Sequence, residues 1–291
     1  MSIYKTPYEQ FQKLDDQELR GCEGMNVSLV SWPEDPYYAM MLGQSASWRP
    51  WKDKFSSEEV VKMLDDMISG KIWMGQVFES INFTFKIENI SRATTHQIVR
   101  TRVGFGAMQE SGREGTWDKA PFITPLTILE QPVAHMNYVN NILTQIHDYR
   151  QMQERWKVPP QDARFVFCHA VAQNLWATYN FRALLETANK RLCCNMQWEV
   201  NTVFRMIRDA VLEKFPHLGV LIKSHCEREG EHKQKDNTNY YKPGAINNGN
   251  KVYFELEGMV CGKAGKFSEE EIELMLKEEK NEISKRTNSL E

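Results

Sequence analysis

The sequence lacks the features that mark several large classes of protein. Its six cysteines form no Cys-x-x-Cys pair, which excludes a disulfide framework or a zinc ribbon and suits a reducing compartment. No stretch approaches 18 uninterrupted apolar residues, and the first ten residues contain no apolar signal region. We therefore expect a cytoplasmic protein without a membrane anchor. Basic residues are not in excess, since 36 Lys and Arg face 39 Asp and Glu. Nucleic-acid binding through a general basic field is thus not expected, and any anion site must be local.

What the chain does have is enough apolar material for a substantial core. Its 291 residues are 41% hydrophobic and include 14 Phe, 8 Trp and 10 Tyr, which argues against disorder. No repeat or low-complexity linker divides it, so we expect one domain over residues 1–291. Prolines at 33, 36 and 50 suggest an irregular segment over 1–55, and the polar, Gly- and Asn-rich stretch 227–250 suggests a surface loop insertion.

Apolar spacing predicts both helices and strands. Residues 81, 83, 85 and 87 alternate as in a half-buried strand before a turn at 89–91, and 251–257 alternates in the same way. Capping boxes at Ser56/Glu59 and Ser268/Glu271 each begin a helix, and Gly70 ends the first. Further helices are predicted at 91–100, 131–155, 161–174 and 182–214. The fold class predicted is mixed α/β, with an antiparallel sheet flanked by long helices.

The densest group of functional side chains lies between residues 95 and 113. Arg100, Arg102 and Arg113 supply planar charged groups suited to phosphate or to imide carbonyls. Gln97, Gln109 and Ser111 add neutral donors and acceptors, and nearby glycines let the backbone approach a ligand. These residues predict a site for an anion and a heterocycle. A surface helix end whose arginines pair with acids fits the same residues, and the pattern alone leaves both interpretations open.

The segment Ser91-Arg-Ala-Thr-Thr-His-Gln-Ile-Val-Arg-Thr-Arg102, followed by Gln109-Glu-Ser-Gly-Arg113, resembles the flavin-dependent thymidylate synthases. Their signature is Arg-His-Arg, about seven residues, Ser, and Arg two further on. A second block agrees in order and spacing: Arg164, Asn180-Phe-Arg182 sixteen residues later, Arg191, and Gln197-Trp-Glu-Val200. Together the two blocks cover roughly residues 74–215, which is far more specific than a short motif.

The resemblance implies a reaction and its participants. In that family a uridine monophosphate is methylated at C5, methylenetetrahydrofolate supplies the carbon, reduced FAD supplies hydride, and NADPH regenerates the flavin. It also implies a homotetramer with active sites shared between subunits, and no metal. The substrate residues implied are Gln97, Arg100, Gln109, Ser111, Gly112, Arg113, Arg164 and Arg191, of which Arg100, Ser111 and Arg191 are expected to be catalytic. The flavin residues implied are Arg100, Thr101, Arg102, Asn180, Arg182, Glu186 and Asn195.

The sequence departs from the family pattern at several of these positions. Thr101 stands where the family has the central histidine, Glu186 stands where an amide is common, and Met74 to Ser80 lacks the usual histidines before the strand. These departures motivate two alternatives. One is a diverged enzyme that hydroxymethylates the nucleotide, or methylates UMP or a cytidine nucleotide. The other is a non-catalytic paralogue that binds nucleotide but not flavin.

Cys168-His169, with Gln173 four residues later, also resembles the nucleophile segment of the unrelated cysteine-dependent thymidylate synthases. A nucleophilic thiolate needs exposure and a lowered pKa. The apolar run from Phe165 predicts a helix instead, so we interpret Cys168 as a core residue. His225, Cys226 and His232 have irregular spacing in a polar segment, and we interpret them as solvated and not as metal ligands.

Overall fold

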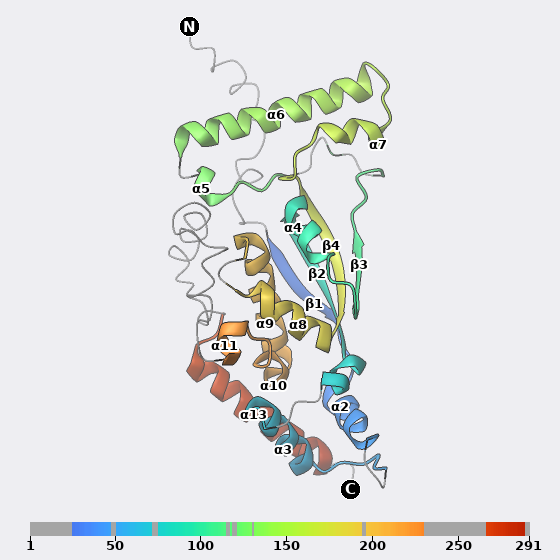
Figure 1. Cartoon of the computed structure of the whole chain (residues 1–291), viewed down its shortest axis with the longest axis vertical. Coiled ribbons are helices and arrows are strands. Elements are labelled where there is room, and N and C mark those ends of the chain that lie inside the picture. Colours follow the sequence, from blue (N-terminus) through green and yellow to red (C-terminus); the bar gives the residue numbers. More distant parts are fainter. Residues whose placement is uncertain are drawn as a thin grey trace.

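The protein forms a mixed α/β fold built on an antiparallel sheet, as predicted. The computed structural model describes residues 25–47, 51–71, 75–114, 117, 121–129, 131–193, 196–229 and 266–288. Within these residues four strands pair in the order β1-β2-β4-β3, each antiparallel to its neighbour. The strands are β1 (Asn26–Ser31), β2 (Asn82–Ser91), β3 (Phe105–Gln109) and β4 (Ala172–Asn180). Helices α4, α8 and α9 lie in front of the sheet in Figure 1.

Helices make up most of the remaining described residues. Those next to the sheet are α4 (Arg92–Ile98), α8 (Phe181–Arg191) and α9 (Trp198–Lys214). The others are α2 (Pro36–Ser45), α3 (Ser57–Ile68), η2 (Gly75–Ser80), α5 (Leu126–Leu129), α6 (Pro132–Glu154), α7 (Pro160–Ala163), η3 (Arg164–Val166), α10 (Pro216–Gly219), α11 (His225–Glu229) and α13 (Glu269–Asn288). None of the described helices is both long enough and apolar enough to span a bilayer.

The period-2 pattern of β2 places its aromatic residues in the core. Phe83, Phe85 and Ile87 are fully buried, and the ring of Phe83 packs edge-on against Phe181 at the start of α8. The opposite face of the sheet is more open, because Met108 of β3 and Trp176 of β4 pair across the strands and remain exposed. One face of the sheet therefore carries the main core.

The capping signals are confirmed in detail. Ser56 and Glu59 form a reciprocal capping box at α3, and Gly70 adopts the left-handed φ of 75° that ends the helix. Ser268 and Glu271 form the same pair of hydrogen bonds at α13. Pro132 begins α6, where its missing N–H costs no hydrogen bond.

Two predictions near the N-terminal part are wrong. The segment 1–55 is not wholly irregular, because it contains β1 and α2, which begins at Pro36 behind the Asp35 cap. Proline at the first helical position starts a helix and does not prevent one. The chain also does not turn at 89–91. Instead β2 continues to Ser91 across a register shift, with Asn89 at a φ of 53°.

Two predicted helices are also revised. Residues 161–174 form the short α7 and η3, a turn, and then the first residues of β4, which pair with β2. The predicted helix 182–214 is divided into α8 and α9. Within the predicted loop 227–250, residues 227–229 close α11. Its remaining residues and the predicted strand 251–257 lie outside the described residues.

Two hydrophobic clusters stabilise the molecule, which is elongated in Figure 1. The larger cluster packs the sheet against α8, α9 and the helices near the N- and C-terminal parts. The smaller one joins α6 to the segment before β4, through residues that include Trp117, Phe122, Tyr149 and Val171. The start of β4 lies at the junction of the two clusters.

Candidate functional site

Helix α4 carries the first block of predicted residues, and a buried carboxylate fixes its N-terminus. Ser91 caps the helix by accepting from the Thr94 N–H at 3.1 Å. Glu199 of α9 is 1% exposed and accepts from the Ser91 N–H, the Ser91 hydroxyl and, at 2.7 Å, the Thr94 hydroxyl. Negative charge at a helix N-terminus is favourable because the exposed N–H groups there carry partial positive charge. Glu199 therefore ties α4 to α9.

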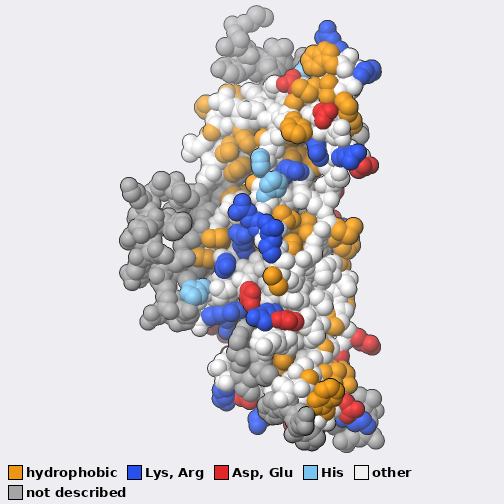
Figure 2. Space-filling view, turned by 45° about the vertical axis from the view of Figure 1, so that its right-hand side comes forward, with side chains coloured by type: hydrophobic (Ala, Val, Ile, Leu, Met, Phe, Trp, Pro, Cys, Tyr) orange, Lys and Arg blue, Asp and Glu red, His pale blue; other side chains and the backbone are white. Residues whose placement is uncertain are grey.

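The C-terminal end of α4 meets the end of α8, which brings the two predicted blocks together. The Arg191 guanidinium donates to the Gln97 backbone carbonyl at 2.9 Å and to Gln97 Oε1 at 3.4 Å. Burial lowers the pKa of Arg191, and the positive charge of Arg100 lowers it further. Arg100 and Arg102 are exposed beside this pair. Figure 2 shows a group of Lys and Arg side chains in the middle of one face, with His side chains next to it.

The end of β3 places the second half of the motif. Gln109 is half-buried, whereas Ser111 and Arg113 are exposed, and the Ser111 hydroxyl accepts from the Arg113 N–H at 3.2 Å. Gly112 is buried against Arg164, because a Cβ on Gly112 would lie 3.2 Å from Arg164 Cδ and Nη1. Glycine favours this close approach, because any other residue would push the Arg164 side chain away by a few tenths of an ångström.

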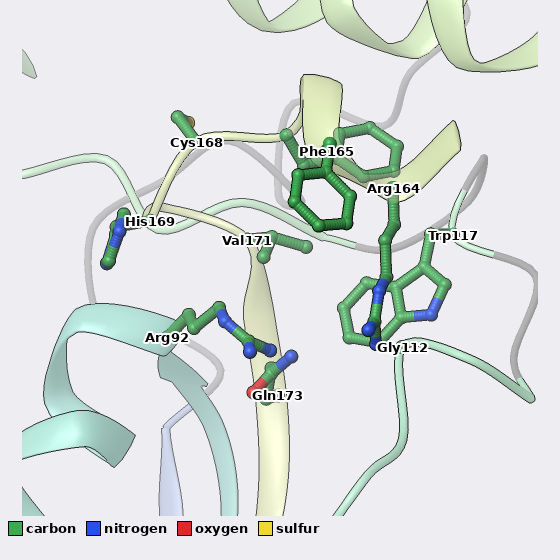
Figure 3. A pocket seen from close by; sticks show the side chains of 10 residues that line it. Arg92, Gly112, Trp117, Arg164, Phe165, Cys168, His169, Val171 and Gln173 are labelled. Atoms are coloured by element: carbon green, nitrogen blue, oxygen red, sulfur yellow. The ribbon is translucent and has the colours of Figure 1, made fainter. Parts of the chain in front are cut away.

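A cavity of about 300 Å³ opens beside Gly112 and Arg164 (Figure 3). The sequence predicted only these two as site residues. The other lining residues are Arg92, Trp117, Phe165, Phe167, Cys168, His169, Val171 and Gln173. None of the ten is acidic, so the walls carry the positive charge of two arginines. A signal for two of the missed residues was present, since Arg92 lies in the matched segment and Gln173 ends the Cys168 motif.

Histidines border the same cavity. The rings of His96 and His169 pack edge to face with centroids 5.4 Å apart. Burial lowers the pKa of His96, and the neighbouring charges of Arg92, His169 and Arg100 lower it further. The local field therefore opposes added positive charge and favours an anion.

The described residues that the resemblance assigns to flavin lie in the segment after α4 and at the start of α8. Thr101 Oγ1 lies 3.5 Å from Thr187 Oγ1, and Asn180 caps α8 by accepting from the Ala183 N–H at 2.8 Å. Arg182 is held by two carboxylates, Glu79 at 2.6 Å and Glu186 at 3.1 Å. Asn195 lies outside the described residues.

Three arginines fit a flavin pyrophosphate. Two of them have exposed guanidiniums, and the third would exchange a carboxylate partner for the pyrophosphate. The Arg100 and Arg102 guanidiniums are exposed and suit pyrophosphate oxygens. Arg182 can bind the same group when the pyrophosphate replaces Glu79 or Glu186, which are both exposed partners. Exposed ion pairs are weak enough for such an exchange.

Cys168 lies at the cavity rim and not in a helix, so the predicted helical core position is wrong. It is half-buried, and its N–H donates to Gln145 Oε1 at 2.8 Å. That its thiol takes no part in chemistry stays a prediction. Among the described residues no group of three or more metal-ligating side chains occurs.

The fold and the site define a mixed α/β protein with a cavity at one end of an antiparallel sheet, lined by two arginines. The family model described as "Thymidylate synthase complementing protein" matches residues 28–217. The chain therefore belongs to this family.

Known relatives agree with that assignment. The chain is 27% identical to a flavin-dependent thymidylate synthase of Sulfolobus acidocaldarius over 67% of this chain and 75% of the relative. It is 30% identical to that of Geobacter sulfurreducens over 62% of this chain and 78% of the relative. Its fold resembles the crystal structure of a UMP/dUMP methylase from Streptomyces cacaoi bound with 5-Br dUMP. That match has a TM-score of 0.58 and 15% identity, and it covers 70% of this chain and 95% of that one.

Proposed function

We propose that the protein is a methyltransferase that adds a methyl group to C5 of a uridine monophosphate nucleotide, in the manner of dUMP to dTMP. The observation that carries this proposal is a cavity lined by Arg92 and Arg164, with no acidic side chain among its described lining residues, in a chain of this family. A nucleotide needs positive charge at its phosphate and amide or guanidinium groups at its base. The site offers both within one face.

The proposed substrate residues divide by position. Gly112 and Arg164 line the cavity, Ser111 and Arg113 are the chain neighbours of Gly112, and these four suit the phosphate. Gln97, Arg100, Gln109 and Arg191 lie toward the end of α4 and suit the sugar and base. Arg100 and Arg191 would stabilise negative charge on the pyrimidine carbonyls as the ring reacts, because a preorganised positive charge favours the developing anion. Ser111 would orient the nucleotide from the phosphate side.

The proposed cofactor residues are Arg100, Thr101, Arg102, Asn180, Arg182 and Glu186, with Asn195 outside the described part. When bound, FAD supplies the hydride, methylenetetrahydrofolate supplies the one-carbon unit, and NADPH restores the reduced flavin. The chain's own residues would bind and orient the cofactor: Arg100 and Arg102 would neutralise the pyrophosphate, and Asn180 caps the start of α8. In this scheme no protein thiol attacks the base.

We also propose that the active protein is a homotetramer in the cytoplasm. Exposed apolar side chains support assembly: Met108 in β3, Val103 before it and Phe165 in η3 are 78%, 83% and 82% exposed. Large exposed apolar side chains can serve as contact surfaces between subunits. The free thiols of Cys168 and Cys193 suit a reducing compartment.

A non-catalytic nucleotide binder is the second candidate, and the pairing of Arg182 with Glu79 and Glu186 favours it. A flavin absorption spectrum of the purified full-length chain, followed by dUMP titration, separates the two. The enzyme retains flavin or takes it up, and dUMP perturbs the flavin spectrum. Nucleotide binding without any flavin uptake would support the binder instead.

A further inference from the structure

The floor of the cavity is formed by a buried amide with an unused donor. Gln173 of β4 is 1% exposed, and its Nε2 has no hydrogen-bond partner in the described part of the chain. Leaving a buried amide N–H unpaired is costly, so such groups usually face a ligand or water. Figure 3 shows Gln173 and Arg92 reaching toward the cavity from β4 and α4.

A relay of hydrogen bonds fixes which end of the Gln173 amide faces the cavity. The Thr95 hydroxyl donates its only proton to the Arg92 carbonyl at 3.0 Å, so Thr95 Oγ1 must accept from Gln109 Nε2, which lies 3.0 Å away. Gln109 Nε2 also donates to Gln173 Oε1. Turning the Gln173 amide around would bring two donors together. Its Nε2 therefore stays on the cavity side.

The described walls of the cavity consequently present donors to a ligand, and none of the ten lining residues is acidic. Arg92 and Arg164 supply guanidiniums from two different elements, and Gln173 supplies an amide N–H₂. A phosphate monoester is the complementary ligand, since it carries up to two negative charges and has several acceptor oxygens pointing in different directions. A pyrimidine edge or a sugar hydroxyl would bring donors of its own and leave some of these groups unpaired.

We propose that Gln173 and Arg92 bind the phosphate of the nucleotide substrate, and that Thr95 is a positioning residue that keeps the Gln173 donor turned toward it. This inference rests on the proposed function, because it assumes that the ligand is a nucleoside monophosphate. It adds three residues that the motif comparison did not assign. It also predicts that the enzyme discriminates nucleotide from nucleoside through the floor of the cavity.

The experiment compares the affinity for dUMP with that for deoxyuridine, using the full-length protein with flavin present. Gln173→Leu removes the donor, and Arg92→Met removes a half-buried charge with less risk to the core. Each is expected to weaken dUMP binding by about tenfold to a hundredfold while deoxyuridine binding changes less than about twofold. Gln173→Glu places a carboxylate against the phosphate and is expected to weaken dUMP binding further.

Two variants of Thr95 test the relay of hydrogen bonds. Thr95→Ser keeps the hydroxyl and is expected to discriminate dUMP from deoxyuridine as the unmodified protein does. Thr95→Val keeps the shape but removes the acceptor for Gln109, so it should reduce that discrimination. Thermal unfolding of every variant shows whether it is folded, and a merely structural role for Thr95 would lower both affinities together.

Three results would overturn the inference. Unchanged dUMP affinity in Gln173→Leu and Arg92→Met, while the unmodified protein binds dUMP, would show that these residues do not contact phosphate. Equal losses for dUMP and deoxyuridine would place them at the base or sugar. If the variants bind dUMP normally and lose affinity only for polyglutamylated folate, the cavity binds the folate carboxylates and not the phosphate. If the unmodified protein binds neither dUMP nor UMP, the proposed function itself fails.

Discussion

Individual arginines in this site differ in how far the structure depends on them. Arg113 is exposed at the end of β3, whereas Arg191 is half-buried and joins α8 to the Gln97 carbonyl of α4. Removing either takes a charge-assisted contact away from the ligand, which is worth on the order of 1.5–3 kcal/mol. We therefore expect Arg113→Ala and Arg191→Ala each to weaken nucleotide binding by about tenfold or more.

Thermal unfolding distinguishes the two variants. Arg113→Ala should keep the melting temperature, and Arg191→Ala should lower it, because the Gln97 carbonyl loses its donor. Titration of dUMP into both variants tests the site assignment, and unchanged affinity in both would contradict it.

His96 offers a pH-dependent test of the local field. Its pKa lies below the ordinary 6.5, chiefly because of burial and then because of Arg92, His169 and Arg100. The neutral ring is thus favoured in the fold, so the stability it contributes is present above pH 6.5 and is lost as the pH falls toward its folded-state pKa. Between pH 7 and pH 5, the melting temperature of His96→Gln should therefore fall less than that of the unmodified protein.

The same histidine reports on the ligand. A phosphate dianion in the neighbouring cavity should raise the pKa of His96, which histidine-selective NMR can follow during dUMP titration. A downward shift, or none when dUMP is bound, would contradict an anion beside Arg92.

A variant of Cys168 tests whether its thiol acts as a nucleophile. Cys168 lies on the cavity rim, where its N–H donates to the Gln145 amide oxygen at 2.8 Å. It is therefore closer to the proposed nucleotide site than the sequence suggested. We still expect Cys168→Ser to retain turnover, since the proposed reaction needs no protein nucleophile. A covalent nucleotide adduct mapped to Cys168 by mass spectrometry would contradict this expectation.

At the scale of elements, α4 depends on one buried carboxylate. Glu199 accepts three hydrogen bonds from Ser91 and Thr94, and its removal would leave these buried donors unpaired. We expect Glu199→Ala to cost on the order of 3 kcal/mol of stability and to raise the KM for nucleotide, because α4 holds Gln97 and Arg100. Asn201→Ala is a useful comparison, since Asn201 is a buried polar residue on the same helix that contacts the Arg191 and Cys193 carbonyls instead.

The sequence predicted the elements whose signals are local. The capping boxes, Gly70 and Pro132 each act within one turn, so α3, α6 and α13 began where expected. The apolar run 165–171 predicts a helix, but it forms η3 and the turn before β4, where Val171 bridges Phe122. Pairing with β2, which is distant in sequence, makes a strand of the residues that follow, Ala172–Asn180. A short apolar run does not report such long-range contacts.

Only those site residues that belong to the sequence motif could be predicted. Arg100, Arg113, Arg164 and Arg191 follow from a recognisable order in the sequence, and of these four only Arg164 lines the cavity. Arg92 and Gln173 meet because Ser91 pairs with Ala172 in the sheet register. No local pattern reports that pairing, so their shared cavity could not be predicted from spacing.

At the scale of the whole molecule, α13 is fastened to the fold by a second buried carboxylate. Glu279 accepts from the Tyr37 hydroxyl of α2 and from the His217 N–H at 2.9 Å, and it contacts His217 Nδ1 at 2.6 Å. This helix lies beyond the residues that the family model matches. Its attachment links the N- and C-terminal parts of the chain.

We expect Glu279→Ala to lower the melting temperature by roughly 5–10 °C, since it leaves buried donors unpaired in a chain of this size. Glu279→Gln keeps the shape and one acceptor and should lose less. Because the helix is far from the cavity in Figure 1, dUMP affinity at a temperature well below melting should be unchanged. A large loss of affinity in folded Glu279→Ala would contradict the separation of the two regions.

The most direct test of the central claim is product analysis by mass spectrometry. The protein is incubated with FAD, NADPH and ¹³C-labelled methylenetetrahydrofolate against dUMP, UMP, dCMP and CMP in parallel. We expect a labelled methyl group at C5 of a uridine monophosphate, formed only when flavin and reductant are both present. Label in a hydroxymethyl group or only on a cytidine nucleotide, or no labelled product from protein that binds both flavin and dUMP, would contradict it.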